Sequence, residues 1–121
     1  VVEDNYINQQ VVMEMLKNLH YHYHLAENGQ EALNVLKNHP ETFDLILMDC
    51  QMPLMNGYDT TRNIRANALG KYNKDIPIIA LTANAMKGDN VKCFEAGMND
   101  YLAKPFQSEQ LAEILHKWGC S

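Results

Sequence analysis

Short apolar runs and helical segments alternate along the entire chain. The apolar, β-like runs cover residues 1–2, 21–26, 45–48, 76–83 and 101–105. Each is followed by a segment of helical periodicity, and these segments open at Asn5, Asn28, Gly57, Met86 and Ser108. Strict alternation is typical of parallel strands joined through helices, and 121 residues suffice for one such domain. The sequence therefore predicts an α/β fold with a five-stranded parallel sheet and helices on both faces.

The first helical segment shows the pattern in detail. Asn5 stands where an N-cap is expected, because its side-chain oxygen can accept a hydrogen bond from the first turn. Four apolar residues then recur four positions apart, namely Ile7, Val11, Met15 and Leu19. This spacing predicts that they share one face of the helix.

The apolar run in the middle of the chain ends in a carboxylate. In FDLILMDCQMP, residues 43–53, the run from Leu45 to Met48 leads directly into Asp49, and Pro53 stops the segment. A short apolar run bounded by turn signals is typical of a strand buried on both faces. In open α/β sheets, functional sites form beyond the carboxyl ends of such strands. Asp49 therefore stands where a functional residue is expected.

Polar residues also follow other predicted strands. Glu3 and Asp4 come after the first strand, Thr82 ends the fourth and Lys104 closes the fifth. Crowded carboxylates repel one another, and a hard divalent cation such as Mg²⁺ is the usual remedy. A lysine beside such a site supplies a charge for a phosphoryl oxygen. Asp49 would then be the nucleophile that forms an aspartyl phosphate, so these residues predict a Mg²⁺-dependent phosphoacceptor.

Four motifs give the chain a family resemblance. VVEDN, LILMDCQMPLMNG, IIALTAN and YLAKPF fall in the order and spacing of the response-regulator receiver domain, the phospho-accepting module of two-component signalling. The resemblance covers essentially the whole chain, so we expect a single receiver domain over residues 1–121 whose first strand is truncated at the N-terminus. The segments EDN, MDCQMP and ALTANAM are further similar to receivers of hybrid sensor histidine kinases.

The resemblance implies a role for each site residue. Asp49 would accept phosphate from a phosphohistidine in a histidine-to-aspartate phosphorelay. Asp4 and Asp49 would bind Mg²⁺ together with the backbone carbonyl of Gln51, and Glu3 would act on the metal through water. Lys104 would contact the phosphoryl group.

The resemblance also implies a conformational switch. Thr82 and the Ala83 amide would bind the other phosphoryl oxygens, and the ring of Tyr101 would turn inward on activation. Gly57 resembles the turn glycine of the family. The implied fold is flavodoxin-like, a doubly wound sheet with strand order 2-1-3-4-5. Such a domain is an enzyme only in the sense that it assists its own phosphorylation and hydrolysis.

Composition limits the partners. Fifteen Asp and Glu against ten Lys and Arg give a formal net charge of −5, which repels nucleic acid and anionic lipid. No apolar stretch approaches the ~20 residues of a membrane span. The three cysteines, Cys50, Cys93 and Cys120, form no CxxC pair and favour a reducing compartment. We expect a cytoplasmic monomer, or the cytoplasmic part of a membrane-anchored sensor kinase, whose partner is a histidine kinase or a histidine-containing phosphotransfer domain.

Single residues also allow simpler interpretations. An Asp after a strand is most often a turn or N-cap residue, Thr82 alone is an ordinary strand residue, and Lys104 alone is a surface charge. Tyr101 is also consistent with packing. Cys50 has no basic neighbour in sequence, which favours a buried apolar role. The joint register of the acids, the threonine and the lysine favours the functional interpretation.

Other function classes are open as well. A degenerate receiver that acts only as a protein-interaction module is the main alternative, although such a domain has usually lost an acid or the lysine. A dehalogenase-type phosphatase would need a second Asp where Gln51 stands, and a flavin binder would need a glycine- and hydroxyl-rich loop in place of EDNYINQQ. His20, His22 and His24 would share one side of an extended run. Either the histidines face solvent and the tyrosines face inward or the reverse holds, and both are expected more than metal binding.

Overall fold

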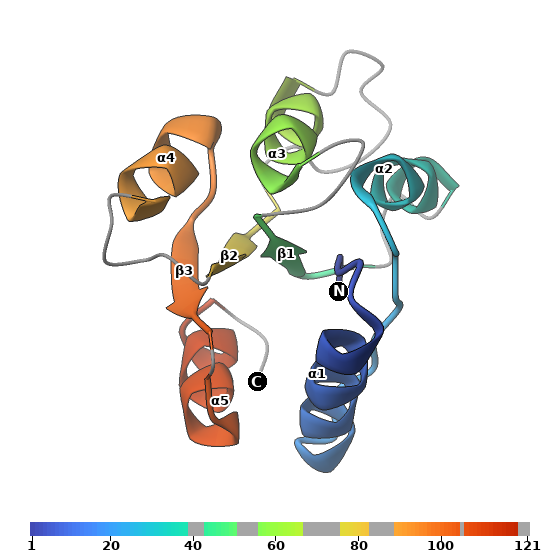
Figure 1. Cartoon of the computed structure of the whole chain (residues 1–121), viewed down its shortest axis with the longest axis vertical. Coiled ribbons are helices and arrows are strands. Elements are labelled where there is room, and N and C mark those ends of the chain that lie inside the picture. The colour runs from blue at the N-terminus through green and yellow to red at the C-terminus, as the bar shows by residue number, and fades with distance from the viewer. Residues whose placement is uncertain (39–42, 51–55, 67–75, 83–88, 105, 119–121) are drawn as a thin grey trace.

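The computed structural model describes residues 1–38, 43–50, 56–66, 76–82, 89–104 and 106–118. Its helices are α1 (Tyr6–Asn18), α2 (Gly29–Asn38), α3 (Gly57–Ala66), α4 (Asp89–Ala96) and α5 (Ser108–Lys117). Its strands are β1 (Ile46–Asp49), β2 (Ile78–Thr82) and β3 (Asp100–Ala103). From α2 onward helices and strands alternate as predicted, and the sheet lies between two layers of helices (Figure 1). Within the described residues, no helix is both long and apolar enough to cross a membrane.

The sheet is parallel, and its order matches the predicted 2-1-3-4-5. β1 pairs with β2, and β2 pairs with β3, both in the parallel sense. On the other side of β1, Val2 forms parallel bridges to Met48 and to Ala26. The segments therefore lie in the order Ala26, Val2, β1, β2, β3. This order confirms the doubly wound, flavodoxin-like architecture.

The first two predicted strands are shorter than the sequence indicated. Val2 and Ala26 contribute isolated bridges, and residues 21–25 form no strand. The Ala26 N–H donates to the Val1 carbonyl at 2.8 Å, and the Ala26 carbonyl accepts from the Glu3 N–H at 3.0 Å. A strand needs a continuing ladder of such bonds, and the pairing between these two segments is limited to one isolated bridge.

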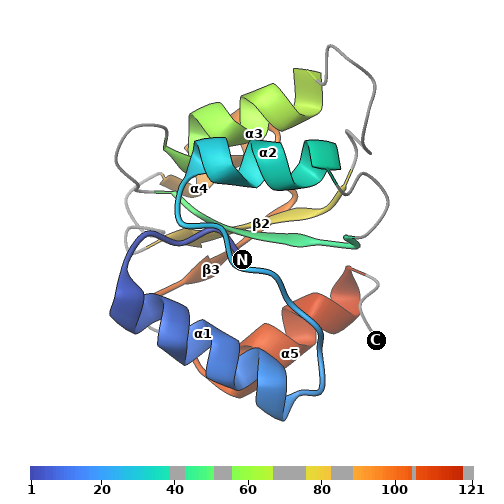
Figure 2. The same cartoon turned by 90° about the vertical axis from the view of Figure 1, so that its right-hand side faces the viewer.

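Alternating side chains of β1 and β2 enter two separate cores. Figure 2 shows α1 and α5 on one face of the sheet and α2, α3 and α4 on the other. The strand residues divide strictly between the two cores: Ile46, Met48, Ile78 and Ala80 enter one, and Leu47, Ile79 and Leu81 the other. Every residue of β1 and β2 is buried, which confirms the prediction of strands covered on both faces.

The buried residues of α1 are not the four apolar residues spaced four apart. Ile7 and Val11 are 71% and 45% exposed, whereas Met15 and Leu19 are partly buried against the core. The residues that α1 buries are instead Gln9, Val12 and Leu16. Several neighbouring positions of this helix are apolar. The spacing of the apolar residues alone therefore does not determine which side of α1 faces the sheet. The Gln9 Nε2 donates to the Glu3 carbonyl at 2.7 Å, and this hydrogen bond satisfies a polar group on the side of α1 that also buries Val12 and Leu16.

Candidate functional site

Three carboxylates meet at the carboxyl edge of the sheet. Glu3 and Asp4 follow Val2, which bridges to β1, and Asp49 is the last residue of β1. One carboxylate oxygen of each acid lies within 4.8 Å of those of the other two, and the described residues hold no other group of three such metal ligands. Glu3 and Asp49 are buried, whereas Asp4 is exposed. The structure therefore brings together the three acids that the sequence assigned to a metal site.

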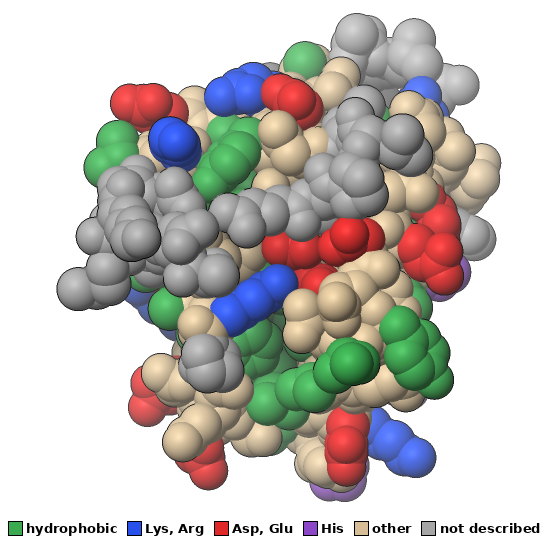
Figure 3. Space-filling model, in the orientation of Figure 1, with side chains coloured by type: hydrophobic (Ala, Val, Ile, Leu, Met, Phe, Trp, Pro, Cys, Tyr) green, Lys and Arg blue, Asp and Glu red, His purple; other side chains and the backbone are tan. Residues whose placement is uncertain are grey.

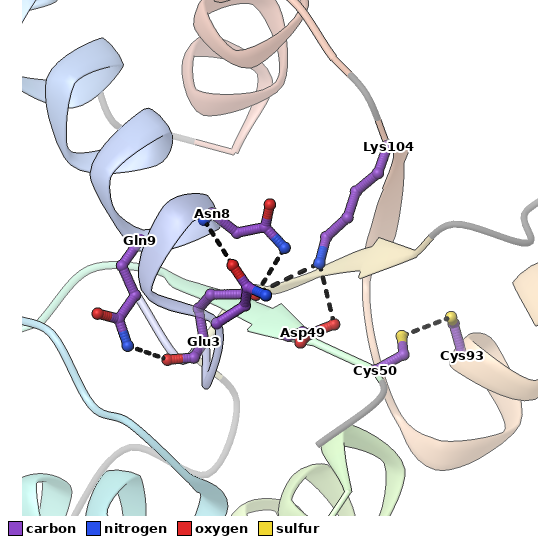
Figure 4. Close-up of polar contacts among 8 residues, drawn as sticks. Glu3, Asn8, Gln9, Asp49, Cys50, Cys93 and Lys104 are labelled. Carbon is purple, nitrogen blue, oxygen red and sulfur yellow. Dashed lines mark hydrogen bonds and ion pairs between the residues drawn. The ribbon is translucent and has the colours of Figure 1, made fainter. Parts of the chain in front are cut away.

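Lys104 places its ammonium group between two of these carboxylates. Its Nζ lies 3.2 Å from Glu3 Oε2 and 3.2 Å from Asp49 Oδ1 (Figure 4). The Lys104 N–H donates to the Thr82 carbonyl at 2.8 Å, so the end of β2 holds the backbone from which this side chain extends. In Figure 3, acidic side chains gather at the middle of this face and a basic side chain reaches them. One ammonium against three carboxylates leaves a net negative charge, which suits a divalent cation with oxygen ligands.

Thr82 lies at the same edge, on the neighbouring strand. It is the last residue of β2 and is 1% exposed. The preceding residue, Leu81, pairs in register with Asp49, so Thr82 extends one position past the acid at the strand ends. The two residues that the sequence assigned through their backbones, Gln51 and Ala83, lie outside the described part of the chain.

Tyr101 belongs to a cluster that links β3 to α4 and α5. Its half-buried ring packs edge-to-face on Phe94, with the centroids 6.2 Å apart. The neighbouring Asp100 accepts hydrogen bonds from Trp118 Nε1 at 3.0 Å and from Lys117 Nζ at 3.2 Å. Burial raises the pKa of Asp100, but the hydrogen bonds from Trp118, the Tyr101 amide and Lys117 outweigh it and hold the pKa below its usual value. The Tyr101 strand is therefore tied to both flanking helices.

Two amide side chains at the site were not predicted as site residues. Asn8 Nδ2 donates to Glu3 Oε1 at 3.0 Å, and Gln9 Nε2 donates to the Glu3 carbonyl at 2.7 Å. Both belong to the first turns of α1, whose predicted N-cap is confirmed: Asn5 Oδ1 accepts from the Asn8 N–H at 3.1 Å. The available signal was a capped helix that starts two residues after an acidic pair, because its first turn lies beside that pair.

α3 begins in direct contact with the end of β1. The Gly57 N–H donates to the Cys50 carbonyl at 3.1 Å. A Cβ on Gly57 would lie 2.3 Å from the Asp49 carbonyl oxygen and 2.9 Å from Cys50 Cα. A larger residue would therefore displace the backbone that carries Asp49, which gives a physical reason for the glycine that the resemblance indicated.

The cysteines and histidines singled out in the sequence take no part in the acidic cluster. Cys50 Sγ lies 3.7 Å from Cys93 Sγ in the core. Burial, followed by the neighbouring Cys93 thiol, raises the pKa of Cys50, so little of it is the reactive thiolate and the predicted apolar role is confirmed. His20, His22 and His24 are exposed, which is one of the two arrangements that the sequence left open, and they do not form a three-ligand group in the described part of the chain.

Known proteins share both the sequence pattern and this fold. Residues 1–116 match the family model of the response regulator receiver domain. The chain is 38% identical over 119 residues to the hybrid signal transduction histidine kinase E of Dictyostelium discoideum. That alignment covers 98% of the chain but only 7% of the kinase, so the chain corresponds to a small part of its relative.

Two solved structures are similar over nearly the whole chain. The receiver domain of the sensor histidine kinase PA1611 from Pseudomonas aeruginosa is 47% identical with a TM-score of 0.86, covering 97% of this chain and 92% of that domain. That structure has a magnesium ion coordinated in its active-site cleft. The receiver domain of Saccharomyces cerevisiae Ssk1, crystallised with the histidine phosphotransfer protein Ypd1, is 36% identical with a TM-score of 0.85, covering 98% of this chain and 86% of the other.

Proposed function

Because the chain belongs to the response regulator receiver domain family, we propose that it is a phosphoacceptor in a histidine-to-aspartate phosphorelay and that Asp49 accepts the phosphoryl group. The main support is the contact of Lys104 Nζ with both Glu3 and Asp49, beside Asp4, at one edge of the sheet. Phosphoryl transfer is catalysed by positioning and charge more than by covalent chemistry of the protein. The buried Asp49 carboxylate provides the positioning, and the Lys104 ammonium with the proposed cation provides the charge.

In the proposed reaction, an Asp49 carboxylate oxygen attacks the phosphorus of a phosphohistidine. The new O–P bond forms as the P–N bond breaks, and the donor imidazole leaves with the bonding electrons and takes up a proton. Lys104 is placed to turn from Asp49 to an oxygen of the arriving group, because an ammonium is a point charge that suits phosphate. Thr82 and the Ala83 amide would bind the remaining oxygens.

Mg²⁺ fits the donor set of this site. Carboxylate oxygens of Asp4 and Asp49, with the Gln51 carbonyl, would hold the ion, and Glu3 would act on it through water. When bound, the ion supplies positive charge to the phosphoryl oxygens. The magnesium ion in the similar receiver domain of PA1611 supports this assignment.

Asp4→Asn is expected to weaken Mg²⁺ binding by more than about tenfold and to slow phosphorylation with it, because it removes the charge of a direct ligand. Glu3→Gln should weaken binding less if Glu3 acts through water. Calorimetric titration with Mg²⁺ measures both, and Asp44→Asn, at an exposed position away from the acidic cluster, is the control. Equal Mg²⁺ affinity in wild type and Asp4→Asn would count against the metal site.

The phosphoryl group is also proposed to reset a switch through Thr82 and Tyr101. A hydrogen bond from the Thr82 hydroxyl to a charged phosphoryl oxygen is worth ~1.5–3 kcal/mol. Moving a two-state population from 1:99 to 99:1 requires about 5.5 kcal/mol, so Lys104, the Ala83 amide and the metal must supply the rest. The inward movement of Thr82 would leave space for the half-buried ring of Tyr101. The surface formed by α4, β3 and α5 would change as a result.

Thr82→Ala is expected to accept phosphate more slowly and to transmit little of the change to Tyr101. Amide NMR shifts with and without a beryllofluoride phosphate mimic would measure the response of residues 89–104. Thr82→Ser keeps the hydroxyl and should respond as wild type does. Shifts of wild-type size in Thr82→Ala would contradict the proposed coupling.

The wider context follows from the relatives. We propose that the chain acts as one receiver domain of a longer cytoplasmic or membrane-anchored sensor kinase, and that its partner is a histidine kinase or a histidine-containing phosphotransfer domain. The Ssk1 receiver crystallised with Ypd1 supports such a partner. Tyr6, Ile7 and Val11 on α1 are exposed, and they follow Asp4 closely in the chain, so a partner that reaches the acidic cluster would meet apolar side chains nearby.

A further inference from the structure

The buried carboxylate of Glu3 has a hydrogen-bond donor on each oxygen. Glu3 is 1% exposed; its Oε1 accepts from Asn8 Nδ2 at 3.0 Å and its Oε2 from Lys104 Nζ at 3.2 Å. Burying a carboxylate without such partners is strongly unfavourable. One of these two donors is shared, however, because Lys104 Nζ also lies 3.2 Å from Asp49 Oδ1.

This sharing has a consequence for the proposed reaction. When Lys104 turns to a phosphoryl group on Asp49, the Oε2 of Glu3 loses that donor. Among the described residues, the Asn8 amide is then the donor that stays on the Glu3 carboxylate. Because the amide is neutral, it does not compete with a cation for the carboxylates as a second ammonium would. The amide also adds no negative charge, whereas a further carboxylate would repel the three carboxylates of the site.

The start of α1 fixes Asn8 in place. Asn8 is the third residue of α1, and its N–H donates to the N-cap Asn5 Oδ1 at 3.1 Å. In a capping box, the side chain at this position reaches back to the N–H of the N-cap. Here the Asn8 side chain extends to Glu3 instead (Figure 4). The Asn8 side chain therefore serves the acidic cluster, while its backbone N–H takes part in the helix cap.

We propose that Asn8 is a positioning residue that orients Glu3 for Mg²⁺ binding and frees Lys104 to move to the phosphoryl group. The inference rests on the proposed function, and it assigns Asn8 a role that acts through Glu3 rather than by contact with the donor. Removing a group that holds a metal ligand or its water network typically weakens metal affinity by about 10–100-fold. We expect a loss of Mg²⁺ affinity in this range when the Asn8 amide is removed.

Asn8→Leu is the direct test, because leucine is close to asparagine in shape, favours helix and removes the donor. Its Mg²⁺ affinity, measured by calorimetry, should fall about tenfold. With acetyl phosphate as donor, the Mg²⁺ concentration for half-maximal phosphorylation should rise, while the rate at saturating Mg²⁺ falls less. Gln10→Ala, at an exposed position of the same helix, is the control and should match wild type.

A double-mutant cycle separates positioning from general destabilisation. If Asn8 acts through Glu3, then Asn8→Leu should cost less than about twofold in a Glu3→Gln background. Wild-type Mg²⁺ affinity in Asn8→Leu, or a loss that persists in full in that background, would overturn the inference. If Asn8→Leu does not fold, Asn8→Ala is judged by the same criteria. Failure of the wild type to bind Mg²⁺ would instead contradict the proposed function itself.

Discussion

Asp49→Asn is expected to incorporate no phosphate from acetyl phosphate above background, while its unfolding temperature stays close to that of wild type. Asparagine matches aspartate in shape but its amide is not a phosphoryl acceptor. Asp49 is the last residue of a strand buried on both faces, and Lys104 Nζ lies 3.2 Å from its Oδ1. A phosphoryl group arriving at this edge therefore meets Asp49 with its charge partner already in place.

The control for this prediction is a carboxylate outside the site. Asp59 on α3 is exposed and pairs with Arg62 at 2.9 Å, so Asp59→Asn should incorporate phosphate as wild type does. Intact mass spectrometry after incubation with acetyl phosphate and Mg²⁺ measures the product directly. Incorporation of wild-type extent in Asp49→Asn would exclude Asp49 as the acceptor.

The charged residues of the site could be predicted because the topology brings strand ends together. In a parallel sheet the carboxyl ends of neighbouring strands lie at one edge. Once the alternation of strands and helices is recognised, Asp4, Asp49 and Lys104 are therefore expected to lie together. The amide contacts to Glu3 could not be predicted in the same way. They depend on the rotation of α1 about its axis, and several of its faces are apolar enough to be buried.

The fold was predicted well where local and global signals agree. β1 and β2 are apolar at every position before their last residues, Asp49 and Thr82, and burial on both faces follows directly. Residues 21–25 carry strand-forming types but form no strand, because a strand also requires a continuous ladder of hydrogen bonds to a neighbouring segment. In α1, Gln9, Val12 and Leu16 are buried, with Gln9 bonded to the Glu3 carbonyl, while the regularly spaced Ile7 and Val11 are exposed. Both differences depend on contacts between separate segments of the chain. Hydrophobic periodicity carries no information about such contacts.

Gly57→Ala is expected to lower the unfolding free energy by about 3 kcal/mol, at the upper end of typical overpacking costs. The new Cβ would lie 2.3 Å from the Asp49 carbonyl oxygen and 2.9 Å from Cys50 Cα, and both are backbone atoms that cannot rotate away. The better helix propensity of alanine returns at most about 1 kcal/mol. The clash of the new Cβ with these backbone atoms can therefore be relieved only if α3 and the end of β1 move apart.

That separation would also move Asp49 relative to Lys104, so phosphorylation should slow even at temperatures where Gly57→Ala stays folded. Thermal unfolding followed by circular dichroism should show a midpoint about 10 °C below wild type for a domain of this size. Asn63→Ala, at an exposed position of the same helix, should change the midpoint little. Rotation of the alanine methyl group cannot relieve a contact between its Cβ and the Asp49 carbonyl oxygen. An unchanged midpoint in Gly57→Ala would therefore mean that α3 does not approach the end of β1 this closely in solution.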